Sequence, residues 1–387
     1  MKKKIAIFTV SMSGGGAERV IATILDSLEK DYDFHLCLLS NHIAYDLPAN
    51  QKINVLKIPA IFNNSVGSIL VLPLLAFKYY RYCKKNDIEI SFSFLSRPNW
   101  INCLLKYGNR KVKILISERT TTSVYYSSLN SQIIKKVSFF LIKWLYPKAD
   151  LIVPNSQGVA NDLMLNLGVE NHYQVLNNPI AKKKVIALSQ IPINQVSKSS
   201  FKFICVARFF EEKNHQMLLQ AFKRIADKDI ELWLLGDGKF KTDCENICEK
   251  LNISNKVHFL GFDNNPYKYM SKADCFVMTS NFEGFPNVLV EALTCNLPVI
   301  STDCQSGPRE ILAPTTDITY QLTNTIEYAE YGILTPVNNI DLLTQAMEEI
   351  YNNQILRSKY QKNSIRRTAS FDTNIIIKQV DKLFKTT

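Results

Sequence analysis

The sequence lacks the long apolar runs that would place it in or across a membrane. Its most apolar segment, residues 66–77 (VGSILVLPLLAF), has twelve residues and contains Pro73, whereas a membrane-spanning helix needs about 20 apolar residues. The apolar run after the basic start MKKK is six residues long, short of the roughly 7–15 residues of a signal peptide. We therefore expect a cytoplasmic protein without a transmembrane segment.

The sequence also lacks paired metal-binding or disulfide motifs. Its nine cysteines include no CxxC pair and no Cys/His cluster, so we expect reduced core residues and no metal site. Cys244 and Cys248 have helical spacing, but no second pair lies nearby. A length of 387 residues, with 46% apolar residues and only 13 Gly and 14 Pro, predicts two or three packed domains.

Positive charge is concentrated in the first half of the chain. Residues 1–190 carry a net charge of +12, and residues 191–387 carry −1, which indicates an anionic partner for the first half. Residues 76–85 (AFKYYRYCKK) and 133–148 (IIKKVSFFLIKWLYPK) mix bases with large apolar groups. This pattern is typical of helices on anionic membrane surfaces, although a core helix with a solvated basic edge also fits. No nucleic-acid-binding module is recognisable, so we expect no nucleic-acid partner.

Short apolar runs alternate with helix-length amphipathic segments in both halves. This alternation predicts an α/β protein with two doubly wound, Rossmann-like parallel-sheet domains, at residues 1–180 and 195–370. Residues 180–200 read as a polar linker, and we expect a C-terminal helix at 371–387 that packs back on the first domain. The predicted strands are 4–10, 34–40, 53–58, 88–94, 111–117, 149–156, 173–178, 201–207, 230–236, 256–261, 273–280, 297–303 and 331–337. Ligands bind beyond the carboxyl ends of such strands, so two facing domains would hold a ligand in the cleft between them.

A glycine-rich turn follows the first predicted strand. The stretch SMSGGGAERV places Gly14, Gly15 and Gly16 before a helix that should begin near Ala17. Such a turn lets backbone amides approach an anion. It does not match the GxGxxG fingerprint, because Arg19 takes the third glycine position, or a P-loop. A plain turn explains these glycines equally well.

The first strand of the second half leads into two basic side chains. FKFICVA (201–207) is followed by Arg208, and Lys213 comes five residues later. An Arg fork and a Lys point charge at one strand end suit a diphosphate, and solvated surface charge is the alternative. LLGDG (234–238) and FLGF (259–262) end two further strands with glycines, which would keep side chains out of the cleft.

Residues 281–291 (NFEGFPNVLVE) place two carboxylates around a predicted helix start. Gly284 permits a tight turn, and Pro286 suits the first helical position. Glu283 precedes this helix end and Glu291 lies about 7.5 Å along it. Carboxylates bind hydroxyls while a helix start binds phosphate, so the pattern fits a nucleotide sugar. Helix electrostatics alone accounts for Glu283 but poorly for Glu291 in its apolar run, and nothing places the two as a glycosidase pair.

Six motifs taken in order resemble the large retaining glycosyltransferase family 4, which has the GT-B fold. They are GGGAERV, VARFFEEKNHQMLLQAF, LLGDG, FLGF, NFEGFPNVLVEAL and PVISTDCQSGPREIL. The resemblance implies sugar transfer from a nucleotide sugar with retained anomeric configuration and without a metal or cofactor. It implies that Arg208 and Lys213 hold the donor diphosphate, that Glu283 binds the transferred sugar, and that Glu291 binds the ribose. The other residues assigned to the donor site are Gly15, Gly16, Gly261, Phe262, Gly284, Phe285, Pro286, Asn287 and Val288.

One position departs from the family pattern. Many relatives carry a His after the fifth strand, where this chain has ISERT, with Arg119 beside Glu118. Arg cannot act as a base at neutral pH. Arg119 would then bind a phosphate or the acceptor, or Glu118 would take part of the His role, or activity would be impaired, and we favour the first reading. Arg97 and Asn99 are further acceptor-side candidates, and the segment 313–330 has no assigned role.

These observations favour a glycosyltransferase that moves a hexosyl or N-acetylhexosaminyl group, most simply from a UDP-sugar. The expected acceptor is a lipid-linked or cell-surface glycan, such as a capsule or O-antigen precursor, at the inner face of the cell membrane. One alternative is another GT-B enzyme, such as a nucleotide-sugar epimerase. The other is a non-catalytic subunit that binds a sugar nucleotide or a glycan.

Overall fold

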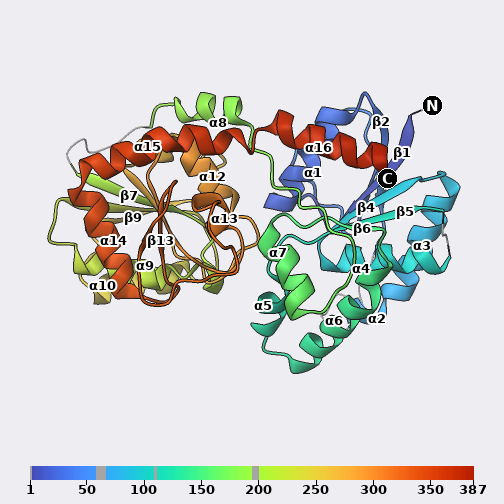
Figure 1. Ribbon diagram of the computed structural model, residues 1–387, viewed down its shortest axis with the longest axis horizontal. Coiled ribbons are helices and arrows are strands. Elements are labelled where there is room, and N and C mark those ends of the chain that lie inside the picture. The colour runs from blue at the N-terminus through green and yellow to red at the C-terminus, as the bar shows by residue number, and fades with distance from the viewer. Residues whose placement is uncertain (1, 58–66, 109–110, 194–199) are drawn as a thin grey trace. The chain divides into compact units, whose positions relative to one another are not determined.

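The computed structural model describes residues 2–57, 67–108, 111–193 and 200–387, which divide into two compact units. The first domain comprises residues 1–179 and 373–387, and the second comprises residues 180–372 (Figure 1). The C-terminal helix α16 (Thr373–Thr386) therefore belongs to the first domain, where it packs beside α1 (Gly16–Leu28).

The predicted linker contains a helix. Residues Lys182–Ser189 form α8, so the expectation of a linker is wrong there, and residues 194–199 lie outside the described residues. Val185 is buried in the core of the second domain, with Leu188 packed against it. These two apolar side chains are three residues apart and share one helix face, which the many lysines and serines around them concealed.

The first domain is built on a six-stranded parallel sheet in the order β3-β2-β1-β4-β5-β6. Its strands are β1 (Lys3–Thr9), β2 (Tyr32–Leu38), β3 (Lys52–Val55), β4 (Ile90–Phe94), β5 (Lys113–Ser117) and β6 (Leu151–Ile152). Its other helices are α2 (Gly67–Leu70), α3 (Leu72–Lys85), α4 (Ser96–Leu104), α5 (Thr122–Ser127), α6 (Gln132–Leu145) and α7 (Gln157–Asn161). Two 3-10 turns are η2 (Leu105–Tyr107) and η3 (Tyr146–Lys148), and η4 (Asp162–Asn166) is a π-helical turn. The predicted strand at 173–178 is absent, because that stretch contributes only an isolated bridge between Ile152 and Tyr173.

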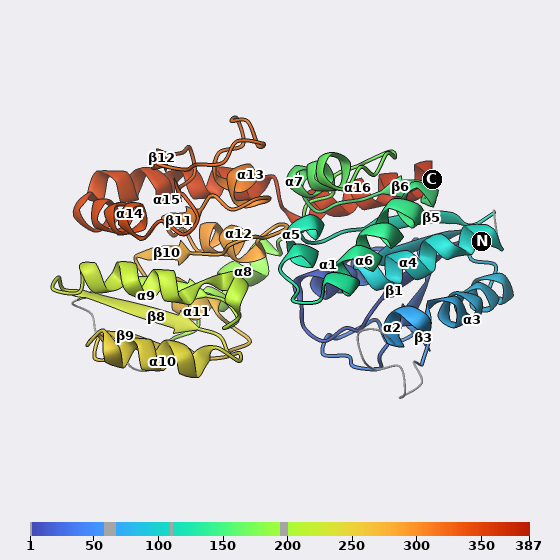
Figure 2. The same ribbon diagram turned by 90° about the horizontal axis from the view of Figure 1, so that it is seen from below.

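Helices cover both faces of this sheet. Apolar side chains of α1 and α16 form one core with the sheet, including Ile24 and Phe384. Side chains of α3, α4 and α6 form the other core, including Tyr79, Ile101 and Ile142. Helix α4 packs between α3 and α6, so these three helices make one layer (Figure 2).

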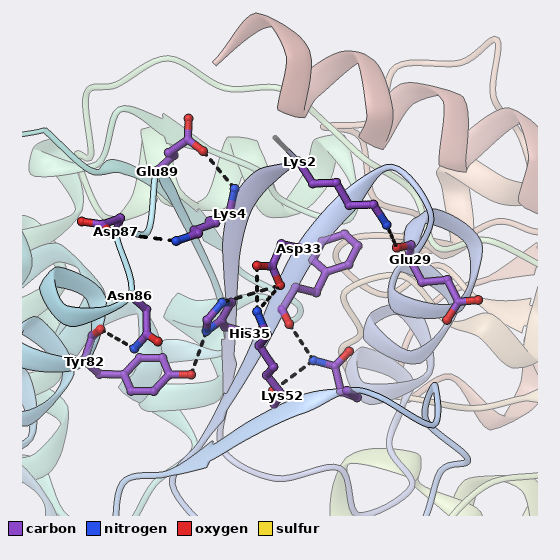
Figure 3. Close-up of polar contacts among 12 residues, drawn as sticks. Lys2, Lys4, Glu29, Asp33, His35, Lys52, Tyr82, Asn86, Asp87 and Glu89 are labelled. Carbon is purple, nitrogen blue, oxygen red and sulfur yellow. Dashed lines mark hydrogen bonds and ion pairs between the residues drawn. The ribbon is translucent and has the colours of Figure 1, made fainter.

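Polar contacts hold the amino ends of the first-domain strands together (Figure 3). The backbone amide of Lys4 donates to Glu89 Oε1 at 2.9 Å, which links the start of β1 to the approach to β4. Lys52 Nζ lies 2.7 Å from Asp33 Oδ1 across β3 and β2. Lysines at this edge therefore have acidic partners beside them.

The second domain is built on a seven-stranded sheet in the order β12-β13-β11-β10-β7-β8-β9. Its strands are β7 (Phe201–Val206), β8 (Ile230–Leu235), β9 (Val257–Gly261), β10 (Cys275–Met278), β11 (Val299–Thr302), β12 (Glu327–Tyr328) and β13 (Ile333–Thr335). Its remaining helices are η5 (Glu211–Lys213), α9 (His215–Arg224), α10 (Lys241–Lys250), α11 (Tyr267–Met270), α12 (Asn287–Thr294), α13 (Pro308–Leu312), α14 (Ile340–Asn352) and α15 (Gln354–Ala369). The two-residue edge strand β12 is antiparallel to β13 and was not predicted. The other strands are parallel, so their carboxyl ends share one edge of the sheet.

Candidate functional site

The loop after β10 and the turn η5 meet at the carboxyl edge of the second sheet. Thr279 Oγ1 donates to the backbone oxygens of Lys213 and Asn214, at 3.0 and 3.1 Å. The amide of Asn281 donates to Glu212 O at 2.8 Å. Backbone bonds therefore fix the start of the loop 281–286 against the turn that carries Lys213.

Lys213 and Glu283 form an ion pair at this junction. Lys213 Nζ lies 2.6 Å from Glu283 Oε1, and Ser280 Oγ donates to the same oxygen at 2.8 Å. Burial alone would lower the pKa of Lys213, but the Glu283 carboxylate raises it above its usual value. The ammonium is therefore charged at neutral pH, and a ligand anion would share it with Glu283.

The helix after this loop begins one residue later than the sequence suggested. Pro286 is the N-cap of α12, with φ −73° and ψ 96°, and Asn287 is the first helical residue. A proline has no side-chain acceptor for the first helical amides, so this helix start keeps the partial positive charge that favours an anion. The loop before it is packed, because Phe285 is buried and makes an edge contact with Phe371 at 5.2 Å between centroids. Gly284 and Pro286 are buried as well.

Glu291 lies in the second turn of α12 and is only 4% exposed. Tyr267 Oη, at the start of α11, donates to Glu291 Oε1 at 3.3 Å. The tyrosine hydroxyl thus supplies one of the hydrogen bonds that a buried carboxylate in an apolar helix needs. Tyr267 was not among the predicted site residues.

Arg208 follows β7 at the same edge of the sheet. Its side chain is exposed, and the guanidinium carbon lies 4.8 Å from the centroid of the Phe210 ring. Gly236, at φ 148°, packs so closely behind it that a Cβ would lie 2.0 Å from Ala207 O. Gly236 thus lets the end of β8 approach the backbone that presents Arg208, while the expectation that LLGDG keeps side chains out of a cleft stays a prediction.

The end of β9 carries Gly261 and Phe262. Gly261 has φ 72°, and its carbonyl accepts from Gly236 N at 2.8 Å. The Phe262 side chain is 74% exposed. An exposed ring at a strand end is available for stacking on a planar ligand.

In the first domain, a carboxylate lies at the glycine-rich turn. Gly15 is the N-cap of α1 and Gly16 its first residue. A Cβ on Gly15 would lie 2.3 Å from Glu18 Oε2, and Glu18 is only 8% exposed. Glu18 is the third helical residue, the position from which an acidic side chain folds back over a helix start. A phosphate at this turn would therefore meet a negative charge, which weighs against the predicted role of Gly15 and Gly16.

The acceptor-side candidates differ in their access to solvent. Glu118 is 1% exposed, and its Oε1 accepts from Tyr146 Oη and, at 3.1 Å, from Asn99 Nδ2. Asn99 is fully buried and also donates to Ser117 O at 3.0 Å. Burial raises the pKa of Glu118 although these bonds favour its charged form. Neither side chain faces solvent, so the structure gives no support to Glu118 as a substitute for the family histidine.

Arg119 is half-buried at the end of β5. Its Nη1 donates to Ser117 Oγ at 3.2 Å, its Nη2 donates to Asn178 Oδ1, and its guanidinium lies 5.6 Å from the Phe94 ring centroid. Burial lowers its pKa, and the carboxylates of Glu118 and Glu18 oppose that shift. Its hydrogen bonds go to neutral groups, while the carboxylates of Glu118 and Glu18 balance part of its charge.

Arg97 lies in the first turn of α4 and is half-buried. Burial lowers its pKa as well. The structure thus places Arg97 and Arg119 after neighbouring strands, β4 and β5, of one sheet.

The described residues contain neither a metal-ligand cluster nor a membrane-spanning helix. No group of three or more His, Cys, Asp or Glu comes together there as metal ligands. No described helix is both long enough and apolar enough to cross a membrane.

Two family models match successive parts of the chain. The model described as "Glycosyltransferase Family 4" matches residues 14–183, and "Glycosyl transferases group 1" matches residues 189–367. An N-acetylgalactosamine-N,N'-diacetylbacillosaminyl-diphospho-undecaprenol 4-alpha-N-acetylgalactosaminyltransferase of Campylobacter jejuni is 36% identical over 96% of both chains. An uncharacterized glycosyltransferase of Methanocaldococcus jannaschii is 32% identical, covering 72% of this chain and 73% of the relative.

Solved structures share the fold at low sequence identity. Anabaena HepE in complex with UDP has a TM-score of 0.76 at 18% identity, with full coverage of both chains. Sucrose-phosphate synthase of Thermosynechococcus elongatus has a TM-score of 0.79 at 17% identity, covering 100% of this chain and 99% of that one. This likeness confirms the predicted pair of Rossmann-like parallel-sheet domains.

Proposed function

Because the chain belongs to the glycosyltransferases with the GT-B fold, we propose that it transfers a sugar from a UDP-sugar to a lipid-linked glycan. The transfer would retain the anomeric configuration and would need no metal ion. The observation that carries this proposal is the cluster of Lys213, Glu283 and Ser280 beside the start of α12.

The second domain offers separate groups for the parts of a nucleotide sugar. Lys213, Arg208 and the start of α12 suit the diphosphate, since all three present positive charge. Glu283 suits hydroxyls of the transferred sugar, and the carboxylate of Glu291 suits the ribose. Phe262 offers an apolar ring for the base.

Charge placement accounts for catalysis without a metal. The departing diphosphate gains negative charge in the transition state, and preorganised cations and helix amides stabilise charge that develops there. Lys213 is well suited because its partner Glu283 keeps it protonated. A phosphate oxygen of the leaving group would take the proton of the acceptor hydroxyl on the same face, so the buried state of Glu118 is compatible with turnover.

The relatives support the proposed donor and acceptor classes. The Campylobacter jejuni enzyme is named for the transfer of N-acetylgalactosamine to a glycan on diphospho-undecaprenol, and a Salmonella typhimurium relative is a lipopolysaccharide 1,6-galactosyltransferase. We infer a hexosyl or N-acetylhexosaminyl donor and an acceptor with a lipid-linked diphosphate for this chain. Arg97 and Arg119 would meet acceptor anions from the first domain.

An outer face of the first domain supports membrane association. Exposed apolar side chains occur on both helices that flank α4, including Phe77 on α3 and Phe140 and Trp144 on α6, which are 56%, 63% and 43% exposed. Lys148 Nζ lies 5.9 Å from the Trp144 ring and 5.3 Å from the Tyr107 ring. Aromatic rings beside lysines are suited to the headgroup region of an anionic membrane. We therefore propose peripheral binding at the inner face of the cell membrane.

A nucleotide-sugar panel tests the function. Purified protein would be heated with UDP, UDP-N-acetylgalactosamine, UDP-N-acetylglucosamine, UDP-galactose and UDP-glucose, and a bound nucleotide raises the unfolding temperature. UDP release with the best ligand would then be followed with and without EDTA and a lipid-diphosphate glycan acceptor. Acceptor-dependent UDP release that EDTA leaves unchanged supports the proposal. Release of an epimerised free sugar favours an epimerase, and binding without any turnover favours a non-catalytic subunit.

A further inference from the structure

The segment 313–330, to which the sequence analysis assigned no role, is hydrogen-bonded to the carboxyl end of β11. It runs from α13 to β12 (Figure 2). The amide of Leu322 donates to Asp303 Oδ2 at 2.9 Å, and Gln321 Nε2 lies 3.3 Å from Asp303 O. Asp303 is the residue directly after β11.

Arg309 on α13 joins this segment to Asp303. Its Nε and Nη2 donate to the two carboxylate oxygens of Asp303 at 3.1 and 2.6 Å. Its Nη1 bonds Thr316 Oγ1 and Glu327 Oε2, both at 2.9 Å. The side chains of Arg309 and Asp303 are 5% and 1% exposed. One buried guanidinium therefore has two sets of contacts: one arm bonds the strand end at Asp303, and the other arm bonds the segment 313–330.

The charge balance argues against a ligand at Arg309. Two carboxylates already surround it, and they raise its pKa although burial alone would lower it. An anion would meet excess negative charge at this place. The arrangement is suited to holding backbone in position.

The loop that Asp303 begins supports the loop that carries Glu283. Phe282 and Gln305 form a β-bridge, and the amide of Glu283 lies 3.5 Å from Gln305 O. Gly307, at φ 83°, is so close to Pro286 that a Cβ would lie 2.4 Å from Pro286 Cδ. A displacement of residues 303–307 would therefore move Glu283 and the start of α12.

We propose that Arg309 is a positioning residue: through Asp303 it holds the loop 303–307, and this loop sets the place of Glu283 for sugar transfer. The effect on catalysis rests on the proposed function, while the effect on the loop does not. A misplacement of about 1 Å can cost roughly 100-fold in rate. Arg309→Gln breaks the bidentate contact, Arg309→Lys keeps the charge with a single contact, and Glu327→Gln weakens only the arm to the segment.

The first measurement is hydrogen exchange of peptides that cover residues 281–289 and 314–328. We expect Arg309→Gln to speed exchange in 281–289, with Arg309→Lys intermediate, and Glu327→Gln to speed exchange in 314–328 alone. Unchanged exchange in 281–289 for Arg309→Gln overturns the proposal whether or not the protein transfers sugar. An equal increase of exchange in residues 281–289 for Glu327→Gln also overturns the proposal, because the loop would then be held through the segment 313–330 and not through Asp303.

The second measurement is the steady-state kinetics of donor use. Rates are divided by the concentration of folded protein, which circular dichroism determines for each variant. We expect kcat to fall about 10- to 100-fold for Arg309→Gln, with partial rescue in Arg309→Lys, while KM for the donor changes less than about 3-fold. Glu327→Gln should stay within about 2-fold of wild type. Wild-type kcat in Arg309→Gln overturns the positioning role. Absence of turnover in the wild type would instead contradict the proposed function, and hydrogen exchange would still decide the positioning.

Discussion

Replacing Lys213 by Ala gives the sharpest test of the donor site. The ammonium lies 2.6 Å from Glu283, and the side chains are 19% and 13% exposed, so water screens the pair only in part. A hydrogen bond to a charged group contributes about 1.5–3 kcal/mol, which corresponds to roughly 10- to 150-fold in affinity for UDP. If the contact strengthens as charge moves onto the departing diphosphate, kcat should fall by about 10²–10³.

Glu283→Gln is the matched variant, because it removes the other charge of the same pair. Lys213 would keep its position but lose the Glu283 carboxylate that now neutralises part of its charge. We expect UDP affinity to stay unchanged or to increase, since the ammonium is then freer to meet phosphate. Turnover should fall, because the carboxylate no longer accepts hydrogen bonds from the sugar hydroxyls.

The assay combines calorimetric titration with UDP and a UDP-release assay in EDTA. Thermal unfolding of each variant is the control for folding. Equal UDP affinity in wild type and Lys213→Ala would refute the diphosphate role of Lys213. A loss of UDP affinity in Glu283→Gln as large as that in Lys213→Ala would refute the division of labour between the two. Inhibition of the wild type by EDTA would contradict metal-free transfer.

Three further predictions concern stability, the ribose site and the membrane. Burial lowers the pKa of His215 to about 4, so between about pH 4 and 6.5 the unfolded chain binds a proton that the folded chain does not. The contribution of His215 to the free energy of unfolding should therefore fall by about 3 kcal/mol from pH 7 to pH 4. Urea unfolding should show a smaller decrease over this range in His215→Phe than in the wild type. Glu291→Ala should weaken UDP binding because the ribose hydroxyls lose their carboxylate partner; unchanged affinity in this variant would remove Glu291 from the ribose role. Vesicles with phosphatidylglycerol should sediment the wild type in low salt and less of it in high salt, and Phe140→Ser with Trp144→Ser should reduce binding; equal binding to neutral phosphatidylcholine vesicles would contradict an anionic surface.

The sequence predicted the fold well because the pattern of apolar residues that marks each strand and helix is local and recurs along the chain. Buried parallel strands are almost continuously apolar, and the helices between them carry one apolar face, so twelve of the thirteen predicted strands coincide with strands of the two sheets. The failures have weak local signals. The stretch 173–178 is apolar only in part, β12 has two residues, and α8 hides two buried side chains among lysines.

Site residues were predictable where one motif holds both partners. Glu283, the start of α12 and Glu291 lie within nine residues, so their order along the helix follows from the sequence alone. The partners that decide their electrostatics come from elsewhere in the chain. Tyr267 is 24 residues from Glu291, and Lys213 is 70 residues from Glu283. Partners so far apart in the chain come together only through the fold, so no local pattern of the sequence pairs them.

The direction of a side chain was the least predictable quantity. Glu118 and Arg119 are neighbours in the loop directly after β5, which ends at Ser117. Glu118 turns into the core, where Tyr146 and Asn99 bind it, while Arg119 contacts Ser117 and Asn178. These two residues, for which the sequence offered alternative roles, thus have separate environments.

The location of the positive charge in the first domain bears on its partner. The glycine-rich turn, which the sequence marked as an anion site, has Glu18 folded over Gly15. At the amino edge of the sheet, Lys52 is paired with Asp33. By contrast, Lys148 in η3, directly after α6, lies 5.9 Å from the half-exposed Trp144 ring of α6. Lysines beside exposed aromatic rings favour an extended anionic surface over a single bound phosphate, which supports our proposal that the first domain binds the membrane and the acceptor.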